Sequence, residues 1–340
     1  MSTFVIPDPK TQKLPVAENI FKSLVLLALL FGSFYTANLA ATAVDASTLA
    51  PALAFVLKWG AIIVLGIFDC MLITGLGVLA HEGIHRIFCR SPFWNELLGG
   101  TLSAFALLPF YANRQFHLTH HSYTHQQGMD PEEVMHNHSS FWYAATAGAL
   151  IAFREQYRLM LINLLNVGNW KYFSRGLKDL ALMAFAIWVY FGVVPSFGIS
   201  VWYSVVPMLI MIMPVFTLRA ISDHHGIPNV ERGKRQREEV YEADKKHWDK
   251  EVAQRHKELS SWIILTYPWM DWLWSHINYH EVHHRYPYVS HVYLKGIFEA
   301  TRGKDSYLVV HGFVRSFLNQ RGRSYYGKPT DKTRLPDPYS

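Results

Sequence analysis

Three short histidine clusters are the residues of this sequence best suited to chemistry. They are His81-Glu82-Gly83-Ile84-His85, His117-Leu118-Thr119-His120-His121 and His280-Glu281-Val282-His283-His284. Positions i, i+3 and i+4 of a helix share one face, so we expect each cluster to aim two or three imidazoles at one point. A zinc ion takes three or four protein ligands, so eight convergent imidazoles indicate two metal centres. Imidazole suits iron, zinc, copper and nickel, and we favour redox chemistry at a pair of irons.

The elements that position these clusters are predicted to be membrane helices. Of the 340 residues, 50% are hydrophobic and only 17% are charged, which is apolar for a soluble domain. A membrane span needs about 20 mainly apolar residues. Four apolar stretches reach or approach this length and pair into two hairpins: Ile20–Val44, Ala52–Ala80, Leu180–Val194 and Ile199–Leu218. We predict an all-α integral membrane protein with four transmembrane helices in two hairpins and a cytoplasmic helical cap that carries the clusters.

The distribution of basic residues predicts the orientation of these spans. The two predicted turns, residues 42–51 and 195–198, contain no Lys or Arg, whereas the segments outside the spans hold nearly all of the 32 basic residues. By the positive-inside rule, the protein is multi-pass with both termini and the active site on the cytoplasmic side. The net charge of +6 is explained by attraction to anionic headgroups, so no nucleic acid partner is expected. Cys70 and Cys89 lack CxxC spacing and are expected to be packing residues.

The remaining segments are expected to build the cap. The apolar stretch 97–111 is too short to span and should cover the metal chamber or lie in the interface. The second cluster should lie on a helix over residues 114–125, and residues 141–153 should form a further interfacial helix. Residues 231–258 contain nine basic and eight acidic residues, which fits either a solvated surface helix or a docking face for an electron donor. We expect one domain over residues 1–340, with a core at about 20–300 and a polar tail at about 321–340.

The three clusters, arranged around two hydrophobic hairpins, resemble the histidine boxes of the membrane fatty acid desaturase and hydroxylase superfamily. The resemblance covers about residues 20–300. It implies a di-iron oxidoreductase of lipid metabolism and fatty acid biosynthesis, with two iron ions, O2 as co-substrate and a lipid acyl chain as substrate. It also implies a separate electron donor of the ferredoxin, rubredoxin or cytochrome b5 type, because the sequence holds no His-Pro-Gly-Gly signature of a fused cytochrome b5.

The resemblance also implies a ligand set. Residues 222–226, Ser-Asp-His-His-Gly, resemble the Glu-His-x-Gly element of the alkane monooxygenases, and matching Asp223 to that Glu makes His224 a ligand in preference to His225. The metal ligands are then His81, His85, His117, His120, His121, His224, His280, His283 and His284. Residues expected to support these ligands from outside are Asp130, which would fix an imidazole tautomer, Asn278, His225 and His125.

The other histidines and the aromatic residues near the clusters are expected to have structural roles. Single histidines without the cluster spacing are expected to be non-ligands: His125, which continues the face of His121, and His136, His138, His276, His291 and His311. Large aromatic residues near the clusters are expected to be interface anchors or core: Tyr123, Trp142, Trp274 and Tyr279. Hydrophobic residues of the segment 105–111 are candidates for lining a substrate channel.

Several functions remain open at this point. The short first box resembles that of acyl-lipid desaturases, which favours the introduction of a double bond, but hydroxylases and ketolases acting on a lipid or carotenoid share it. The first and third clusters also fit His-Glu-x-x-His, the pattern of a zinc metalloprotease with Glu82 or Glu281 as general base. A protease leaves the second cluster without a purpose. A metal transporter is disfavoured because transporters place their ligands within the spans.

Overall fold

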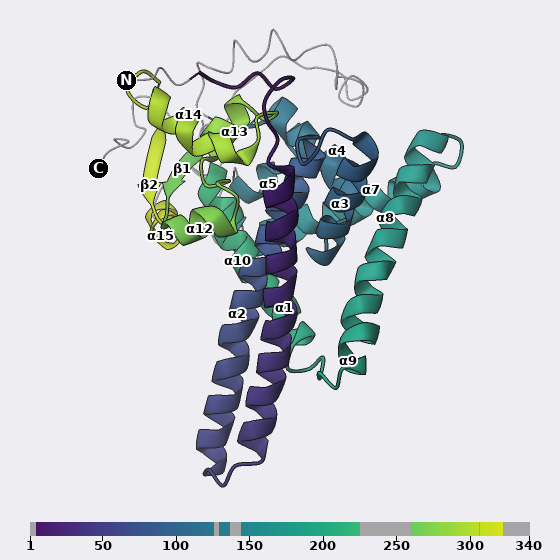
Figure 1. Cartoon of the computed structure of the whole chain (residues 1–340), viewed down its shortest axis with the longest axis vertical. Coiled ribbons are helices and arrows are strands. Elements are labelled where there is room, and N and C mark those ends of the chain that lie inside the picture. The colour runs from purple at the N-terminus through teal and green to yellow at the C-terminus, as the bar shows by residue number, and fades with distance from the viewer. Residues whose placement is uncertain (1–4, 126–128, 137–143, 225–259, 306, 322–340) are drawn as a thin grey trace.

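The computed structural model describes residues 5–125, 129–136, 144–224, 260–305 and 307–321. Helices dominate this part of the chain (Figure 1). The predictions for His138, Trp142, His225, the charged segment 231–258 and the tail beyond residue 321 fall outside the described residues, as does the side chain of His136.

The first predicted hairpin is present and longer than expected. It consists of α1 (Val16–Asp45) and α2 (Pro51–Ile84), both long and apolar enough to cross a membrane. Pro51 occupies the first turn of α2, where its missing N–H costs no hydrogen bond. Because α2 continues past the apolar stretch to Ile84, it delivers the first histidine cluster at its end.

The second hairpin is also present, with shifted bounds. Its first arm joins α8 (Trp170–Trp188), the π-helical turn η2 (Val189–Val193) and α9 (Val194–Ser196), and its second arm is α10 (Val205–His224). Both arms are candidate spans, so the prediction of four spans is confirmed. The first arm begins ten residues before the predicted Leu180 because a mixed polar and apolar segment continues the helix. The second arm begins after Ile199 because Gly198, at φ +73°, ends the preceding turn.

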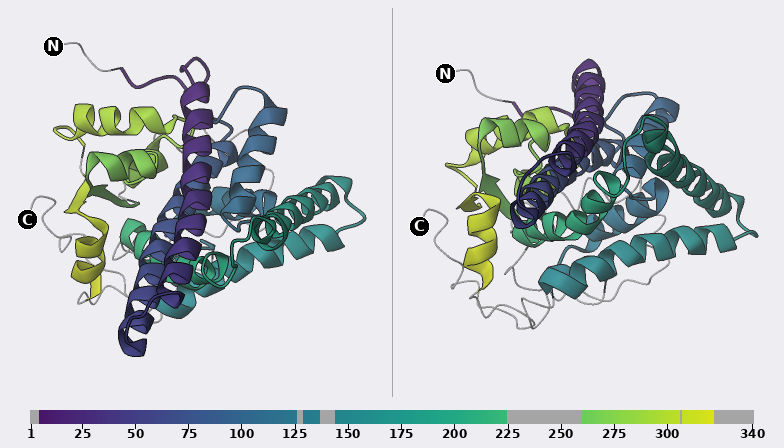
Figure 2. Two further views of the ribbon diagram at one scale, coloured as in Figure 1. Left: turned by 60° about the horizontal axis from the view of Figure 1, so that its bottom comes forward. Right: turned by 90° about the horizontal axis from the view of Figure 1, so that it is seen from below.

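The remaining elements gather at one end of the four long helices, opposite the α1–α2 turn and α9 (Figure 1). In Figure 2, α3 and α4 lie on one side of the first hairpin, and α13 and α14 lie on the other. The helical elements are α3 (Pro92–Phe105), α4 (Phe110–Tyr123), α5 (Glu133–His136), η1 (Ala144–Gly148), α7 (Ala149–Leu165), α12 (Pro268–Leu273), α13 (His280–Arg285), η3 (His291–Tyr293), α14 (Leu294–Thr301) and α15 (Phe313–Arg321). A small parallel sheet of β1 (Trp262–Leu265) and β2 (Leu308–His311), which the sequence analysis did not predict, joins them.

One predicted boundary in this end region was wrong. The apolar stretch 97–111 is divided between two helices, because α3 ends at Phe105 and Leu107 adopts φ +60°. The helix of the second cluster starts at Phe110 and not at residue 114, since Pro109 takes its N-cap position. The break turns α4 back from α3 and brings its histidines toward the end of α2.

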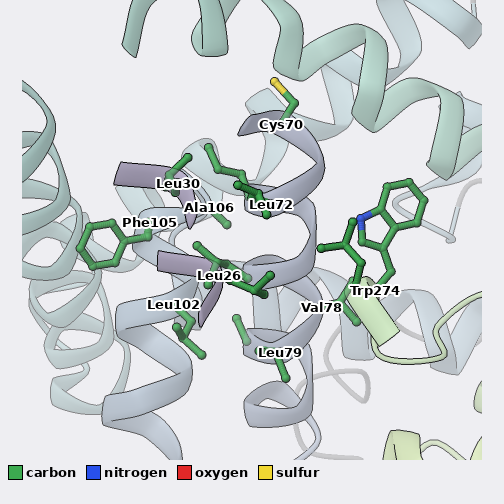
Figure 3. Close-up of a cluster of buried hydrophobic side chains, with 14 of the residues drawn as sticks. Leu26, Leu30, Cys70, Leu72, Val78, Leu79, Leu102, Phe105, Ala106 and Trp274 are labelled. Carbon is green, nitrogen blue, oxygen red and sulfur yellow. The ribbon is translucent and has the colours of Figure 1, made fainter. Parts of the chain in front are cut away.

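The largest hydrophobic cluster ties this end region to the first hairpin. Leu26 and Leu30 of α1 pack with Leu72 and Leu79 of α2 and with Leu102 of α3, all buried (Figure 3). Trp274 joins the same cluster and donates its indole N–H to the carbonyl of Met71 at 3.0 Å. Trp274 is thus a core residue, and both cysteines are buried and unpaired.

A single carboxylate fixes the start of the helix that carries the second cluster. Pro109 offers α4 no side-chain cap. Asp179 of α8 supplies one instead: its two oxygens accept the backbone N–H groups of Tyr111 and Ala112 at 2.8 and 3.0 Å. Because Asp179 is fully buried, water has no access to replace these bonds.

We predict that Asp179→Ala destabilises the protein by about 1–3 kcal/mol, because two buried N–H donors lose their acceptor. The midpoint of thermal unfolding in detergent measures this loss. Asn169→Ala is the matched control, since Asn169 caps the exposed start of α8, where water can substitute. Equal midpoints for the two variants would contradict the prediction.

Candidate metal centre

Nine histidines from four parts of the chain meet in one buried chamber. His81 lies in the last turn of α2, and His85 follows that helix directly. α4 carries three, α13 carries three and α10 ends at His224. The chamber therefore contains every histidine of the three clusters together with His224: His81, His85, His117, His120, His121, His224, His280, His283 and His284.

Five of these imidazoles form one group, the five-histidine group: His81, His85, His117, His121 and His283. One potential ligand atom from each lies within 4.8 Å of those of the others. The Nε2 atom of His117 is 2.7 Å from that of His81, 3.0 Å from that of His85 and 2.8 Å from that of His121. A neutral imidazole nitrogen carries at most one proton, so three such neighbours cannot all be hydrogen-bonded to it. A shared metal ion satisfies all of these lone pairs at once.

The other four imidazoles form a second group, the four-histidine group: His120, His224, His280 and His284. The Nε2 atom of His224 lies 3.2 Å from that of His120 and 3.0 Å from that of His280. His284 closes the group, with its Nε2 atom 3.2 Å from that of His280. The fold therefore brings together two adjacent sets of nitrogen donors.

The division corrects the expectation that each cluster aims at a single point. Residues four apart stay together, as in the pairs His117/His121 and His280/His284, but the residue at i+3 joins the other group. Along a helix, i and i+4 differ by about 40° whereas i+3 and i+4 differ by about 100°. His120 and His283 therefore point across to the neighbouring group.

The donor set fits two metal ions. Metal–imidazole bonds of about 2.0–2.1 Å place neighbouring ligand nitrogens roughly 3 Å apart, as the Nε2 atoms lie here. Burial lowers the pKa of His85 to about 3, with a smaller contribution from Arg114. Burial among other imidazoles likewise holds the pKa of five more histidines well below its usual range: His117, His121, His280, His283 and His284. These rings stay neutral at physiological pH, so their lone pairs are available to a metal.

Two of the rings are oriented through their other nitrogen. The Nδ1–H of His120 donates to Oδ1 of Asp130 at 2.8 Å, and that of His224 donates to the carbonyl of Ser260 at 2.9 Å. Such bonds fix the tautomer and leave Nε2 unprotonated toward the metal. Asp130 occupies the position expected for it, whereas no sequence signal pointed to Ser260, because a backbone carbonyl can belong to any residue.

The other predicted supporting residues lie farther out. Asn278 donates to the carbonyl of Ile264 at 2.8 Å and to Asp271 at 3.0 Å, so its side-chain amide is directed at the β1 segment. His125 belongs to neither group: its backbone N–H donates to Asp130 and its Nε2–H donates to the carbonyl of Ser260 at 2.7 Å.

The remaining described histidines also lie outside both groups. His276 and His291 stack on each other with ring centroids 6.2 Å apart, and the Nε2–H of His291 donates to Asn19 of α1. His311 is exposed at the end of β2.

Glu82 and Glu281, the acids of the two His-Glu-x-x-His patterns, are committed to structural bonds. Oε2 of Glu82 accepts the hydroxyl of Ser290 at 2.8 Å. Glu281 pairs with Nε of Arg285 at 2.8 Å and accepts the backbone N–H groups of residues 260 and 261. Both carboxylates are buried and belong to neither metal group, so neither is placed to act as the general base of a protease.

A pocket opens onto both groups. It encloses about 1060 Å³, including the solvent at its mouth. Its walls come from α2, α4, α7 and α10 and are mostly apolar, with Ala106 and Leu108 from the predicted channel segment among them. The chamber end of the pocket is formed by His81 and His117 of one group and by His120, His224 and His280 of the other. A long apolar molecule in this pocket would meet both metal groups.

We predict that His120→Ala lowers the amount of metal bound to the purified protein by about one ion per chain, because the four-histidine group loses a ligand. Membrane insertion should be unchanged. Elemental analysis of detergent-purified protein measures the effect. His276→Ala is the control, since His276 is partly buried and belongs to neither group. Full metal content in His120→Ala would remove it from the ligand set.

Comparison with known proteins agrees with this site. Residues 53–312, which are 260 of the 340 residues, match the family model described as fatty acid desaturase. The matched range contains all nine histidines and begins after α1. No curated protein matches the chain.

Proposed function

This chain belongs to the fatty acid desaturase family, and from that premise we propose that it uses two irons and O2 to desaturate a lipid acyl chain. Family membership together with four candidate spans makes it a membrane-associated oxidoreductase with a lipid substrate. The observation that carries the finer proposal is the convergence of nine buried or half-buried imidazoles, in groups of five and four, at the end of one apolar pocket.

We propose a role for each of the two histidine groups and for the residues that orient them. The five-histidine group would hold one iron and the four-histidine group the other. When bound, the irons supply the O2-dependent oxidation of an unactivated C–H bond. Asp130 and the carbonyl of Ser260 keep His120 and His224 in the tautomer that presents Nε2 to the metal.

The pocket walls hold the substrate. Ile73, Phe116, Phe153 and Phe216 present apolar side chains that suit a methylene chain. Burying such a chain displaces water from the reacting carbons, which protects the oxidation from side reactions. A chain held along this wall would place neighbouring carbons beside both metal groups, the arrangement needed to remove two adjacent hydrogens.

We also propose the orientation of the protein in the membrane, its electron donor and its domain organisation. We place both termini and the chamber on the cytoplasmic side, because the two turns at the opposite end, residues 42–51 and 195–198, carry no Lys or Arg. Electrons would come from a separate ferredoxin, rubredoxin or cytochrome b5 type donor. The whole chain would act as one domain.

The proposal is tested by elemental analysis of the purified protein combined with the lipid and pigment profile of cells that express it. We expect about two irons per chain and a new unsaturated acyl species. Iron with an oxygenated lipid or carotenoid would instead assign the protein to the hydroxylases or ketolases. A single zinc ion with an unchanged profile would overturn the oxidative function.

We predict that Glu82→Gln retains oxidation, because a glutamine oxygen can still accept the Ser290 hydroxyl and no catalytic step uses this acid. Product formation in membranes measures this. Glu281→Gln is the informative comparison: it should lower stability by about 3–5 kcal/mol, since Arg285 loses its buried partner. Complete loss of turnover in folded, iron-loaded Glu82→Gln would point to a catalytic role for the acid.

A further inference from the structure

Carboxylates surround only one of the two metal groups. Oδ1 of Asp130 lies 2.8 Å from Nδ1 of His120, Oε2 of Glu132 lies 3.9 Å from Nε2 of His120, and Oδ2 of Asp223 lies 4.0 Å from Nε2 of His280. Both histidines belong to the four-histidine group. Among the described residues, no acid lies within ion-pair distance of the five-histidine group. The two groups therefore differ in their electrostatic surroundings.

Asp223 is the carboxylate of this set with an oxygen that accepts no hydrogen bond from the described residues. It is only 2% exposed. Its Oδ2 atom pairs with Nη2 of Arg219 at 3.0 Å, one turn earlier on α10. Its Oδ1 atom is buried without a hydrogen-bond partner among the described residues. A buried carboxylate oxygen without a donor is costly, so such an atom indicates a ligand that the protein alone does not supply.

Asp223 lies beside the four-histidine group. The residue directly precedes His224, lines the same pocket as His120, His224 and His280, and approaches them from the pocket side. Glu132 and Arg219 line this wall with it. When fully ionised, three carboxylates and one guanidinium near the four-histidine group carry a net charge of two negative units: Asp130, Glu132, Asp223 and Arg219. This net charge balances that of one divalent cation held by neutral imidazoles.

We propose that Asp223 is an oxygen ligand of the metal ion held by the four-histidine group. This rests on the proposed two-metal function and extends it. One centre would have five imidazole donors and no carboxylate, and the other four imidazoles and a carboxylate. Oδ2, which lies 4.0 Å from Nε2 of His280, is paired with Arg219, so Oδ1 is the oxygen left to bind the ion. Glu132, with 17% of its side chain exposed, is less enclosed and balances charge from the pocket wall.

The test compares ⁵⁷Fe-loaded wild-type protein with Asp223→Asn by Mössbauer spectroscopy and by the rate of iron release to a chelator. In the wild type we expect two quadrupole doublets of equal area with different parameters. In Asp223→Asn, one doublet should shift or disappear, and one iron should be released at least about tenfold faster. His224→Ala identifies the affected doublet as that of the four-histidine group. Asp271→Asn is the control, since Asp271 is as buried but bonds Thr266 and Asn278.

The outcomes separate this inference from the proposed function. Wild-type protein without two irons would overturn the function itself. Two irons in wild type and Asp223→Asn, with identical spectra and release rates, would overturn only the ligand role of Asp223. Should Asp223→Asn fail to fold, wild-type protein labelled with ¹³C-aspartate and loaded with Mn²⁺ answers the same question. A ¹³C coupling typical of a bound carboxylate is expected in its electron–nuclear double resonance spectrum, and its absence would overturn the assignment.

Discussion

The close approach of nine imidazole nitrogens is the constraint on which this structure depends. Neighbouring Nε2 atoms lie 2.7–3.2 Å apart in this buried chamber. Lone pairs at this distance repel unless a proton or a metal ion lies between them, and protonation is suppressed because burial disfavours charged rings. The protein must therefore hold the rings in place from outside, and much of the fold serves that purpose.

Three of the four helices that carry the histidines are fixed by buried polar contacts with another part of the chain. Asp179 of α8 caps α4. Glu281 ties α13 to the backbone at residues 260 and 261 and to Arg285. Glu82 of α2 accepts the hydroxyl of Ser290, which follows the third cluster. These carboxylates are buried, where a lost bond is not replaced by water, so they fix the spacing of the helices together with the hydrophobic packing.

Features that follow from apolar length or helical periodicity could be predicted from the sequence, whereas contacts between distant residues could not. Apolar length predicted four spans, and the i, i+4 rule predicted that His117 and His121 act together. The rule that places i, i+3 and i+4 on one face did not predict that His120 and His283, the residues at i+3, join the other group. The cap from Asp179 and the carbonyl of Ser260 were missed because these contacts are non-local: their partners are 67 and 36 residues away.

The part of the chain that the family match does not include also supports the chamber. The match begins at residue 53, yet α1 supplies Asn19, which accepts the Nε2–H of His291 at 2.9 Å, and Lys22, which donates to Ser275 at 2.7 Å and to the carbonyl of Trp272. The segment from residue 272 to residue 291 contains the third cluster. α1 anchors it on one side, while the backbone at Ser260 and the carboxylate of Asp305, which pairs with Arg285, anchor it on the other. Because a buried lysine is tolerated only with partners of this kind, α1 cannot shift relative to the segment 272–291 without breaking these bonds. The first span thus positions metal-group histidines that it does not itself carry.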